Sequence, residues 1–272
     1  MSQAGGAPSR VSEVFRRCRQ ERRAALITYV MAGDPSLAAS RSLALACVEG
    51  GADILEIGVP FSDPIADGPT IQRASERALS AGMTLQQCLE LAGELRSSCE
   101  TPIALMGYLN PVLAYGQQEF FEECARHGVD AVIFPDLPPE EAQELCSLAL
   151  ANRVGMVFLL APTSTPERLE AAFKAATAFV YFVSVTGVTG ARAELPAELS
   201  TRLDLVRAES PVPLVVGFGI STPKQVKALA PHVDGVVVGS AIVSQIARPG
   251  TVRERAARVK KLVTSLSSAL GT

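Results

Sequence analysis

The chain has 272 residues, of which 48% are hydrophobic and 19% are charged, and its formal net charge is −3. This composition is typical of a globular protein with one large core, and it gives no reason to expect a nucleic-acid partner. No apolar run is long enough to span a bilayer, and the N-terminal segment MSQAGGAPSR lacks the apolar stretch of a signal peptide. We therefore expect a cytoplasmic protein without a membrane partner.

Cysteine and histidine are poorly arranged for disulfides or metals. The cysteines contain no CxxC pair and mostly lie among Ala and Leu in helix-like segments, so we interpret them as buried or half-buried thiols. The only histidines, His127 and His232, each come just before a strand-like run, and we expect no metal site.

Strand-like and helix-like runs alternate along the chain. After a flexible start at 1–10, an Arg-rich amphipathic helix is predicted over Val11–Arg23. Eight short apolar runs predict strands: Leu26–Val30, Asp53–Val59, Ile103–Gly107, Ala131–Pro135, Gly155–Leu160, Phe179–Val183, Leu214–Phe218 and Gly235–Gly239. Helical periodicity between them predicts helices that include Leu37–Glu49, Thr84–Cys99, Gln118–His127, Glu140–Ala151, Pro166–Ala176 and Pro223–Ala230.

Alternating strands and helices imply a parallel sheet. Eight such units in about 250 residues fit a closed (β/α)8 TIM barrel better than an open doubly wound sheet. We therefore predict a single α/β barrel domain over residues 1–272 with an extra N-terminal helix. The similar segments GADILEIG, GVDAVIFP and VDGVVVGS each begin a strand after an aspartate, so Asp53, Asp130 and Asp234 are expected to have structural roles at the bottom of the barrel.

Catalysis in such barrels takes place at the C-terminal ends of the strands, so the segments that follow the strands are the ones to examine. FSDPIADGPT follows the second predicted strand and YLNPVLAYG follows the third, and we interpret both as loops. The second strand also contains Glu56, which shares a face with Ile54 and Gly58. Burial there would raise its pKa towards neutrality, as general acid–base catalysis requires. A buried ion pair is the alternative, but the predicted strand cores contain no Lys or Arg.

Asp67 lies eleven residues after Glu56, in a segment too rich in Pro, Gly, Ser and Asp to be a helix or a strand. A loop that follows a barrel strand can hold a catalytic group. The alternative is an Asx-turn, or a cap on the helix that begins near Pro69.

Glycine-bearing turns follow the last three predicted strands, at Gly187–Gly190, Gly217–Ser221 and Gly239–Ser240. Glycine lets backbone N–H groups approach an anion, and a helix N-terminus supplies further donors, so these turns together predict a phosphate site. The inward or rim positions are mostly apolar and aromatic and could form a flat slot for an aromatic ring: Tyr29, Met106, Tyr108, Ile133, Leu159, Tyr181 and Phe218.

The five lysines all fall in helices or at helix starts, so no strand-end lysine is placed to form a Schiff base. The two histidines likewise do not support metal-assisted carbon–carbon cleavage. The remaining interpretation is acid–base chemistry by carboxylates on a phosphorylated, aromatic substrate.

The segments LEIGVPFSDPIADGPTIQ, MGYLNP, FPDLPPEE, VSVTGVTGAR and GFGIS, in that order, closely resemble the tryptophan synthase alpha subunit family from about Val11 to the final helix. This family cleaves indole-3-glycerol phosphate to indole and glyceraldehyde 3-phosphate by a retro-aldol reaction, without a cofactor of its own. The resemblance implies that Glu56 is the general acid and base, that Asp67 holds the indole N–H, and that Tyr181 positions the ring.

The resemblance also implies that the phosphate is held by Gly190, Gly219, Gly239 and Ser240, and that Thr189 supports Asp67 when the loop after the sixth strand closes as a lid. The family's partner is a beta subunit that carries pyridoxal phosphate and receives indole through a tunnel, within an alpha2beta2 assembly. Positions that the family uses at that interface are matched here by Asp63, Pro64, Asn110, Asp136 and Pro138. One position departs from many bacterial members, because Val185 stands where they have Arg.

Three other functions remain open. A stand-alone indole-glycerol-phosphate lyase shares the catalytic motif but releases indole freely. A catalytically weak subunit that mainly activates a beta subunit is disfavoured by the intact Glu56 and Asp67. Other phosphate-binding barrels, such as sugar-phosphate isomerases, explain the glycines but not the FSDPIADGP segment.

Overall fold

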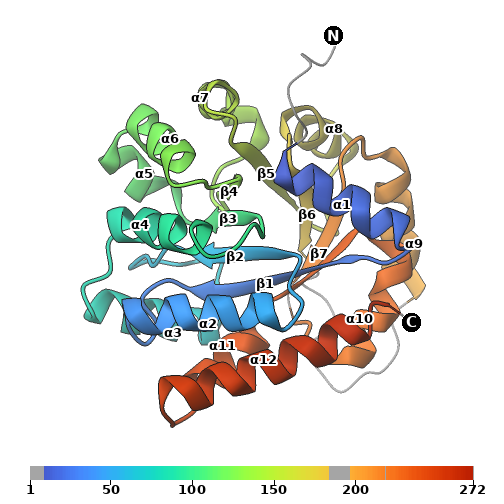
Figure 1. Cartoon of the computed structure of the whole chain (residues 1–272). Coiled ribbons are helices and arrows are strands. Elements are labelled where there is room, and N and C mark those ends of the chain that lie inside the picture. Colours follow the sequence, from blue (N-terminus) through green and yellow to red (C-terminus); the bar gives the residue numbers. More distant parts are fainter. Residues whose placement is uncertain (1–8, 184–196, 218, 272) are drawn as a thin grey trace.

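A computed structural model describes residues 9–183, 197–217 and 219–271. Within them, eight parallel strands pair in chain order, and the last closes onto the first to form a barrel surrounded by helices (Figure 1). The strands are β1 (Ala25–Met31), β2 (Ile54–Gly58), β3 (Ile103–Met106), β4 (Ala131–Ile133), β5 (Gly155–Leu160), β6 (Phe179–Val183), β7 (Leu214–Gly217) and β8 (Gly235–Val238). The predicted (β/α)8 barrel is therefore confirmed.

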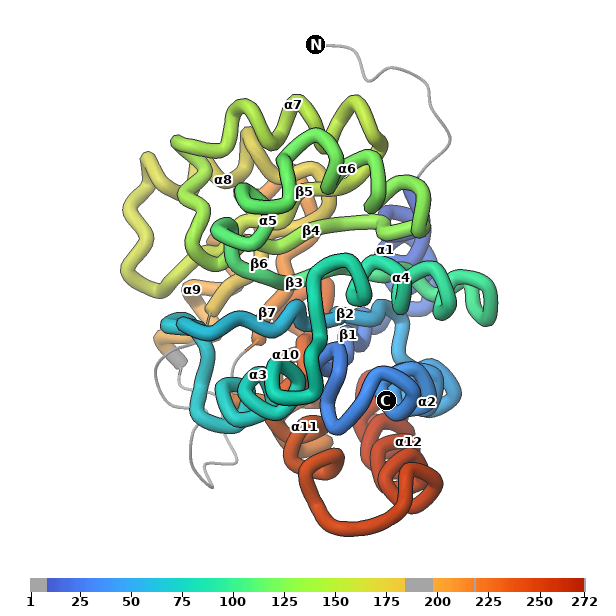
Figure 2. Tube along the Cα trace, turned by 90° about the vertical axis from the view of Figure 1, so that its left-hand side faces the viewer, coloured from blue at the N-terminus to red at the C-terminus, as the bar shows by residue number. Residues whose placement is uncertain are grey.

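The helices that follow the strands come mostly from the predicted segments. They are α2 (Leu37–Glu49), α3 (Pro69–Ser80), α4 (Leu85–Arg96), α5 (Leu109–Tyr115), α6 (Gln117–Arg126), α7 (Gln143–Ala151), α8 (Pro166–Ala175), α9 (Ala197–Glu209), α10 (Pro223–Leu229), α11 (Ser240–Ala247) and α12 (Val252–Ser268), with short 3-10 helices η1 (Pro139–Glu141) and η2 (Ala230–His232). Helices α2 and α12 pack side by side (Figures 1 and 2), so the last helix of the chain completes the outer ring next to the helix that follows β1.

Two predictions of local structure were wrong in detail. The segment YLNPVLAYG contains helix α5 rather than only a loop, because Pro111 falls in the first turn, where a helix tolerates proline. The predicted helix Glu140–Ala151 is divided into η1 and α7 around Ala142.

The extra N-terminal helix, α1 (Arg10–Gln20), closes the bottom of the barrel. Its buried side chains recur at helical spacing: Val11, Val14, Phe15 and Cys18. The Phe15 ring meets the Phe179 ring edge-on at 5.8 Å between centroids, and a Cβ at Gly235 would lie 3.3 Å from Phe15. Ser9 is the N-cap of this helix, and its hydroxyl accepts a hydrogen bond from the Ser12 amide. Of the predicted flexible start at 1–10, the structure describes only Ser9 and Arg10.

The three aspartates that precede strands repeat one arrangement at this end of the barrel. Each carboxylate accepts a hydrogen bond from the first residues of the strand before its own: Asp53 from the Leu26 amide at 2.9 Å, Asp130 from Ile103 at 2.8 Å and Asp234 from Leu214 at 2.9 Å. Each also pairs with an arginine of α1: Arg17, Arg10 and Arg19, respectively. Their predicted structural role is therefore confirmed. All six cysteines are free and are buried or half-buried, as predicted.

Candidate active site

Strand β2 places Glu56 inside the barrel. Its partners in the sheet are Tyr29 of β1 and Ala104 of β3, and residues in register on parallel strands face the same side. Glu56 is only 1% exposed, and its Oε2 atom has no hydrogen-bond partner among the described residues. No described cation pairs with it, so the alternative of a buried ion pair finds no support in this part of the chain.

Burial raises the pKa of Glu56 to about 8, and the nearby Asp67 carboxylate contributes to the rise. The neutral, protonated form is favoured because a charge in this apolar interior would lose its hydration. Glu56 is thus held in the state in which a carboxyl group can donate a proton near neutral pH.

Two glycines make room for two tyrosine hydroxyls beside Glu56. A Cβ at Gly58 would lie 2.0 Å from the Tyr29 hydroxyl oxygen, and one at Gly217 would lie 2.1 Å from that of Tyr181. Gly58 is the last residue of β2, and Gly217 is the last residue of β7 rather than part of the predicted phosphate turn. This role of the two glycines was not predicted, although a glycine inside a buried strand commonly marks a close approach by another group.

The segment after β2 holds Asp67 in a tightly bonded turn. The Asp67 amide donates to the Pro64 carbonyl at 3.0 Å, and the Gln72 side chain donates to the Asp67 carbonyl at 2.9 Å. Ser75, which is buried in α3, exchanges two hydrogen bonds of 2.8 Å with the backbone of Phe61. The alternative of a helix cap is wrong, because Gly68 occupies the N-cap position of α3 and no side chain caps it.

Tyr108 links this segment to the one after β3. Its hydroxyl accepts a hydrogen bond from the Ala66 amide at 2.9 Å and donates to Asp67 Oδ2 at 3.4 Å, while its ring stacks on Phe61 at 5.1 Å. Burial raises the pKa of Asp67 to about 6, and the hydrogen bond from Tyr108 acts in the opposite direction. Tyr108 was predicted only as part of an apolar slot, and its bond to Asp67 was missed.

The structure therefore separates two neighbouring carboxyl groups by their pKa values. At pH 7, Glu56 is mostly protonated and Asp67 is mostly ionised, since their pKa values are about 8 and about 6. Such a pair titrates as a coupled unit. Paired groups whose environments move their pKa values apart are typical of acid–base sites, with one group as the acid and the other as a fixed anion.

Most of the predicted slot residues line the interior around Glu56. Register places Met106 beside Gly58 and Ile133, and Leu159 beside Tyr181, so these side chains share the inner face with Tyr29. Burial raises the pKa values of Tyr29 and Tyr181, and both rises include repulsion from Glu56 and Asp67. The seventh predicted member, Phe218, lies outside the described residues.

The described part of the predicted phosphate site lies at the ends of two paired strands, β7 and β8. Gly239 is the N-cap of α11 and Ser240 is its first residue, and both are partly exposed. Gly219 follows β7 with a φ of 78°, a left-handed conformation that favours glycine. The remaining predicted residues of this region, Thr189 and Gly190, lie outside the described residues, as do Val185 and the lid.

The residues predicted to meet a partner subunit lie on the segments after β2, β3 and β4. Asp63, Asn110 and Asp136 are exposed, whereas Pro64 and Pro138 are partly buried. The Asp136 carboxylate accepts from the Leu109 amide at 3.0 and 3.1 Å and so joins the second and third of these segments. Two apolar side chains nearby in the chain are also exposed, Ile65 at 86% and Leu113 at 49%.

The described residues contain no group of three or more His, Cys, Asp and Glu side chains arranged to hold a metal ion. No helix in the same part of the chain combines the length and apolar character needed to cross a membrane.

A closed parallel barrel with one carboxyl group in its interior and a second on the segment that follows the same strand, with separated pKa values, defines a (β/α)8 enzyme of the acid–base class. The family model described as "Tryptophan synthase alpha chain" matches residues 15–270. The tryptophan synthase alpha chain of Geobacter sulfurreducens is 48% identical over 263 residues, which cover 97% of this chain and 99% of that protein. The alpha chain of Pelobacter propionicus is 46% identical over 262 residues, 96% of this chain and 98% of the other.

Solved structures give the same result. A structure of Mycobacterium tuberculosis tryptophan synthase superposes with a TM-score of 0.88 at 40% identity, covering 97% of this chain and 99% of that one. The tryptophan synthase alpha chain of Legionella pneumophila gives a TM-score of 0.89 at 34% identity, with 97% and 98% covered. The chain belongs to the tryptophan synthase alpha chain family, and it is a lyase of tryptophan biosynthesis that cleaves indole-3-glycerol phosphate to indole and glyceraldehyde 3-phosphate.

Proposed function

We propose that Glu56 and Asp67 divide the acid–base work of this retro-aldol cleavage. The observation that supports the proposal best is the separation of their pKa values around neutrality, to about 8 and about 6. Protonated Glu56 donates its proton to C3 of the indole ring. The ring nitrogen becomes positively charged, and the ionised Asp67 accepts the N–H hydrogen bond and stabilises that charge.

The same carboxyl group then completes the reaction. Glu56, now a carboxylate, removes the hydroxyl proton from the glycerol carbon attached to the ring. That carbon becomes the aldehyde carbon, the carbon–carbon bond breaks, and its electron pair returns to the ring and neutralises the nitrogen. Glu56 gives one proton and recovers one, so indole and glyceraldehyde 3-phosphate are formed without any change in the enzyme.

The surroundings of the two carboxyl groups suit this substrate. Tyr181 positions the ring and Glu56, and the apolar slot of Tyr29, Met106, Tyr108, Ile133 and Leu159, completed by Phe218, holds the indole. The phosphate binds at Gly219, Gly239 and Ser240, where the N-terminus of α11 offers backbone donors, together with Gly190. Thr189 supports Asp67 when the lid closes. The chain needs no cofactor, since the chemistry requires only proton transfers.

The partner is a beta subunit that carries pyridoxal phosphate and receives the indole in an alpha2beta2 assembly. The exposed Asp63, Asn110 and Asp136, with Pro64 and Pro138, form the contact surface on the segments after β2, β3 and β4. These segments also hold Asp67 and Tyr108, so a partner that binds there contacts the segments whose hydrogen bonds through the Tyr108 hydroxyl position Asp67. We place the assembled enzyme in the cytoplasm.

One assay distinguishes this function from a stand-alone lyase. Indole release from indole-3-glycerol phosphate is measured for the purified chain, alone and with a beta subunit. We expect the chain alone to release indole slowly and the beta subunit to stimulate this release strongly. High release that the beta subunit does not change would identify a stand-alone lyase, and stimulation of the beta reaction without any indole release would identify an activating subunit.

A further inference from the structure

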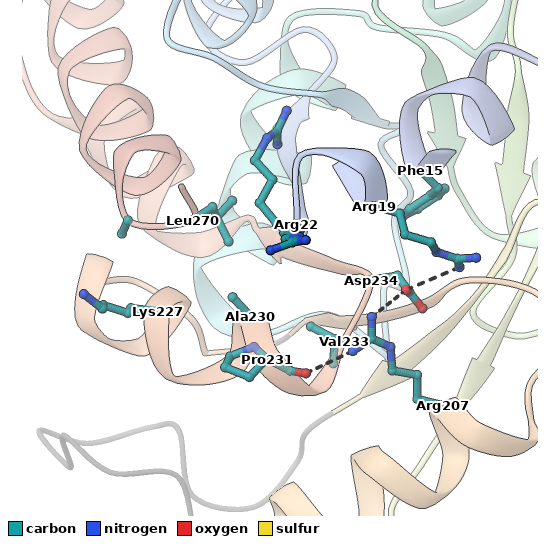
Figure 3. A pocket seen from close by; sticks show the side chains of 12 residues that line it. Phe15, Arg19, Arg22, Arg207, Lys227, Ala230, Pro231, Val233, Asp234 and Leu270 are labelled. Carbon is teal, nitrogen blue, oxygen red and sulfur yellow. Dashed lines mark hydrogen bonds and ion pairs between the residues drawn. The ribbon is translucent and has the colours of Figure 1, made fainter. Parts of the chain in front are cut away.

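A cavity of about 460 Å³ lies at the end of the barrel where the strands begin (Figure 3). It is bounded by α1, α9, α10, η2 and the chain that follows α12. The loops that carry Asp67 and the proposed phosphate site lie at the opposite ends of the strands. The cavity is therefore separate from the active site.

The cavity is strongly cationic. Five of its lining residues are basic, Arg19, Arg22, Arg23, Arg207 and Lys227, and a single lining residue, Asp234, is acidic. The chain as a whole carries a formal net charge of −3, so this concentration of positive charge runs against the average. A concave surface lined by charge of one sign attracts small ions of the opposite sign.

The existing ion pairs use only part of this charge. Asp234 pairs with Arg207 at 2.9 Å and lies 3.7 Å from Arg19, as the dashed lines in Figure 3 show. Arg23 is committed to Asp53 at 2.6 Å. The side chains of Arg22 and Lys227 have no hydrogen bond or ion pair to any of the described residues.

The other wall of the cavity is apolar. Its accessible surface comes from Ala230 and Ala269, which are partly exposed, beside the buried core residue Leu270. Pro231 adds a further apolar surface beside Arg207, to which its carbonyl is hydrogen-bonded at 2.9 Å. A ligand that fits both walls combines negative charge with an apolar ring or chain, and the volume lies within the range of small-molecule sites.

We propose that this cavity binds a small organic phosphate of about nucleotide size. Arginine guanidinium groups present paired donors that match phosphate oxygens, and several cations around one cavity favour a ligand with two or more negative charges. The apolar wall takes the ring of the ligand. The binding groups come from α1 and the turn that follows it, and from α10, so a bound phosphate ties the N-terminal part of the chain to the C-terminal part of the barrel and stabilises the fold.

ATP is a suitable probe, and its affinity is measured by calorimetric titration of the full chain. The titration uses the Glu56→Gln variant saturated with indole-3-glycerol phosphate, which it should bind but not cleave. The substrate then occupies the phosphate region at the other end of the barrel, so that ATP does not bind there. We expect submillimolar binding that weakens as salt is added. The double variant Arg22→Ala/Lys227→Ala should bind ATP at least about tenfold more weakly, since it removes two charge-assisted contacts.

The chain offers a matched control in Arg153→Ala/Lys224→Ala. Arg22 and Arg153 are both exposed, both precede a strand and both have a left-handed φ, of 54° and 59°. Lys224 and Lys227 are both exposed on α10, but Arg153 and Lys224 do not line the cavity. The control should bind ATP as the unchanged chain does, and a thermal melt of each variant verifies that it is folded.

Three results would overturn the proposal. One is the absence of ATP binding at millimolar concentration. Another is an equal loss in the two double variants, which would indicate diffuse attraction by surface charge rather than a site. The third is much tighter binding of a short RNA than of ATP with the same dependence on Arg22 and Lys227, which would make the cavity part of a nucleic-acid surface.

Discussion

Buried carboxyl groups have lowered or raised pKa values depending on the end of the barrel at which they lie: the lower end, where the strands begin, or the upper end, which holds the active site. Asp53 and Glu56 are three residues apart at the start of one strand, and both are almost completely buried. Asp53 accepts hydrogen bonds from Arg23, Arg17 and the Leu26 amide, and these outweigh the effect of burial, so its pKa lies below the usual value. Glu56 has no such partners among the described residues, and burial raises its pKa to about 8.

The difference shows that burial alone does not decide whether a carboxylate is structural or chemical. Asp130 and Asp234 repeat the arrangement of Asp53, each with an arginine of α1 and a backbone amide as partners. These three groups hold α1 against the bottom of the barrel. Asp67, like Glu56, has no cationic partner in the described chain, and Tyr108 is the side chain that bonds its carboxylate. The hydrogen-bond and ionic partners of the carboxylates, rather than their burial, distinguish the two ends of the barrel.

The largest expected effect concerns the upper end. Glu56→Gln should reduce kcat about 10²- to 10⁴-fold, because the amide keeps the shape of the side chain but exchanges no proton. The Michaelis constant should change little. Steady-state kinetics with indole-3-glycerol phosphate measures both, and Asp53→Asn is the control that should leave kcat nearly unchanged. A loss confined to the Michaelis constant would remove Glu56 from the chemistry.

At the lower end, Asp53→Asn should instead destabilise the fold, by about 2 kcal/mol, because the Leu26 amide and Arg23 lose a buried acceptor. Chemical denaturation compared with the unchanged chain gives this difference. A stability loss below a few tenths of a kcal/mol would mean that water or a neighbouring carboxylate replaces the Asp53 partner.

Stability as a function of pH should change in opposite directions for these two variants. The pKa of Glu56 is raised from 4.5 to about 8, so its contribution to stability is complete below 4.5 and is lost as pH rises towards 8. Glu56→Gln should therefore gain stability relative to the unchanged chain over that range. The pKa of Asp53 is lowered from 3.8, so its contribution is present above 3.8 and is lost as pH falls further.

Denaturation midpoints at about pH 3.5, 5, 7 and 9 test this contrast between the two groups. The cost of Asp53→Asn should shrink at the acidic end, and the gain of Glu56→Gln should be greatest at the alkaline end. Differences that stay constant across this range would show that neither pKa is shifted in the folded chain.

The sequence was sufficient to predict what depends on pattern. The alternation of apolar runs and amphipathic segments predicted the barrel, and an acidic residue in a buried strand pointed to Glu56. The aspartates before the strands were correctly assigned to the lower end because their positions recur. Each of these predictions uses spacing within a segment or a pattern that recurs from one segment to the next.

Features that depend on contacts between distant segments were not predictable in this way. Tyr108 bonds Asp67 across 41 positions of the chain, and Gly58 serves a tyrosine that lies on another strand. The cationic cavity brings together α1, α9 and α10, whose residues give no joint signal in the sequence. YLNPVLAYG was predicted to be a loop because it follows a strand, but Pro111 lies in the first turn of a helix, where proline is tolerated, and helix α5 forms there.

A smaller effect is expected at the proposed phosphate site. Ser240→Ala should raise the Michaelis constant for indole-3-glycerol phosphate about tenfold, because one hydrogen bond to a charged group is lost. The variant should keep kcat and should bind bare indole, which has no phosphate, normally. Ser240 is the better position for this test than Gly219, where the left-handed φ of 78° would strain any other residue whether or not phosphate binds. Equal weakening of both ligands would place the phosphate elsewhere.

The smallest effect is expected for Tyr108→Phe, which should change the pKa of Asp67 without removing a partner of Glu56. The Tyr108 hydroxyl lowers the pKa of Asp67, so its removal should raise that pKa above about 6. The bond is long, at 3.4 Å, and the Phe61 ring still packs on the substituted ring, so the fold should be retained.

Because less Asp67 is ionised in the Tyr108→Phe variant, kcat/KM at about pH 6 should fall about two- to threefold, as expected for the loss of one weak hydrogen bond. Activity at about pH 8, where Asp67 is ionised in both proteins, should be nearly equal. An equal fall at both pH values would mean that Tyr108 acts by packing against the substrate and not through the charge of Asp67.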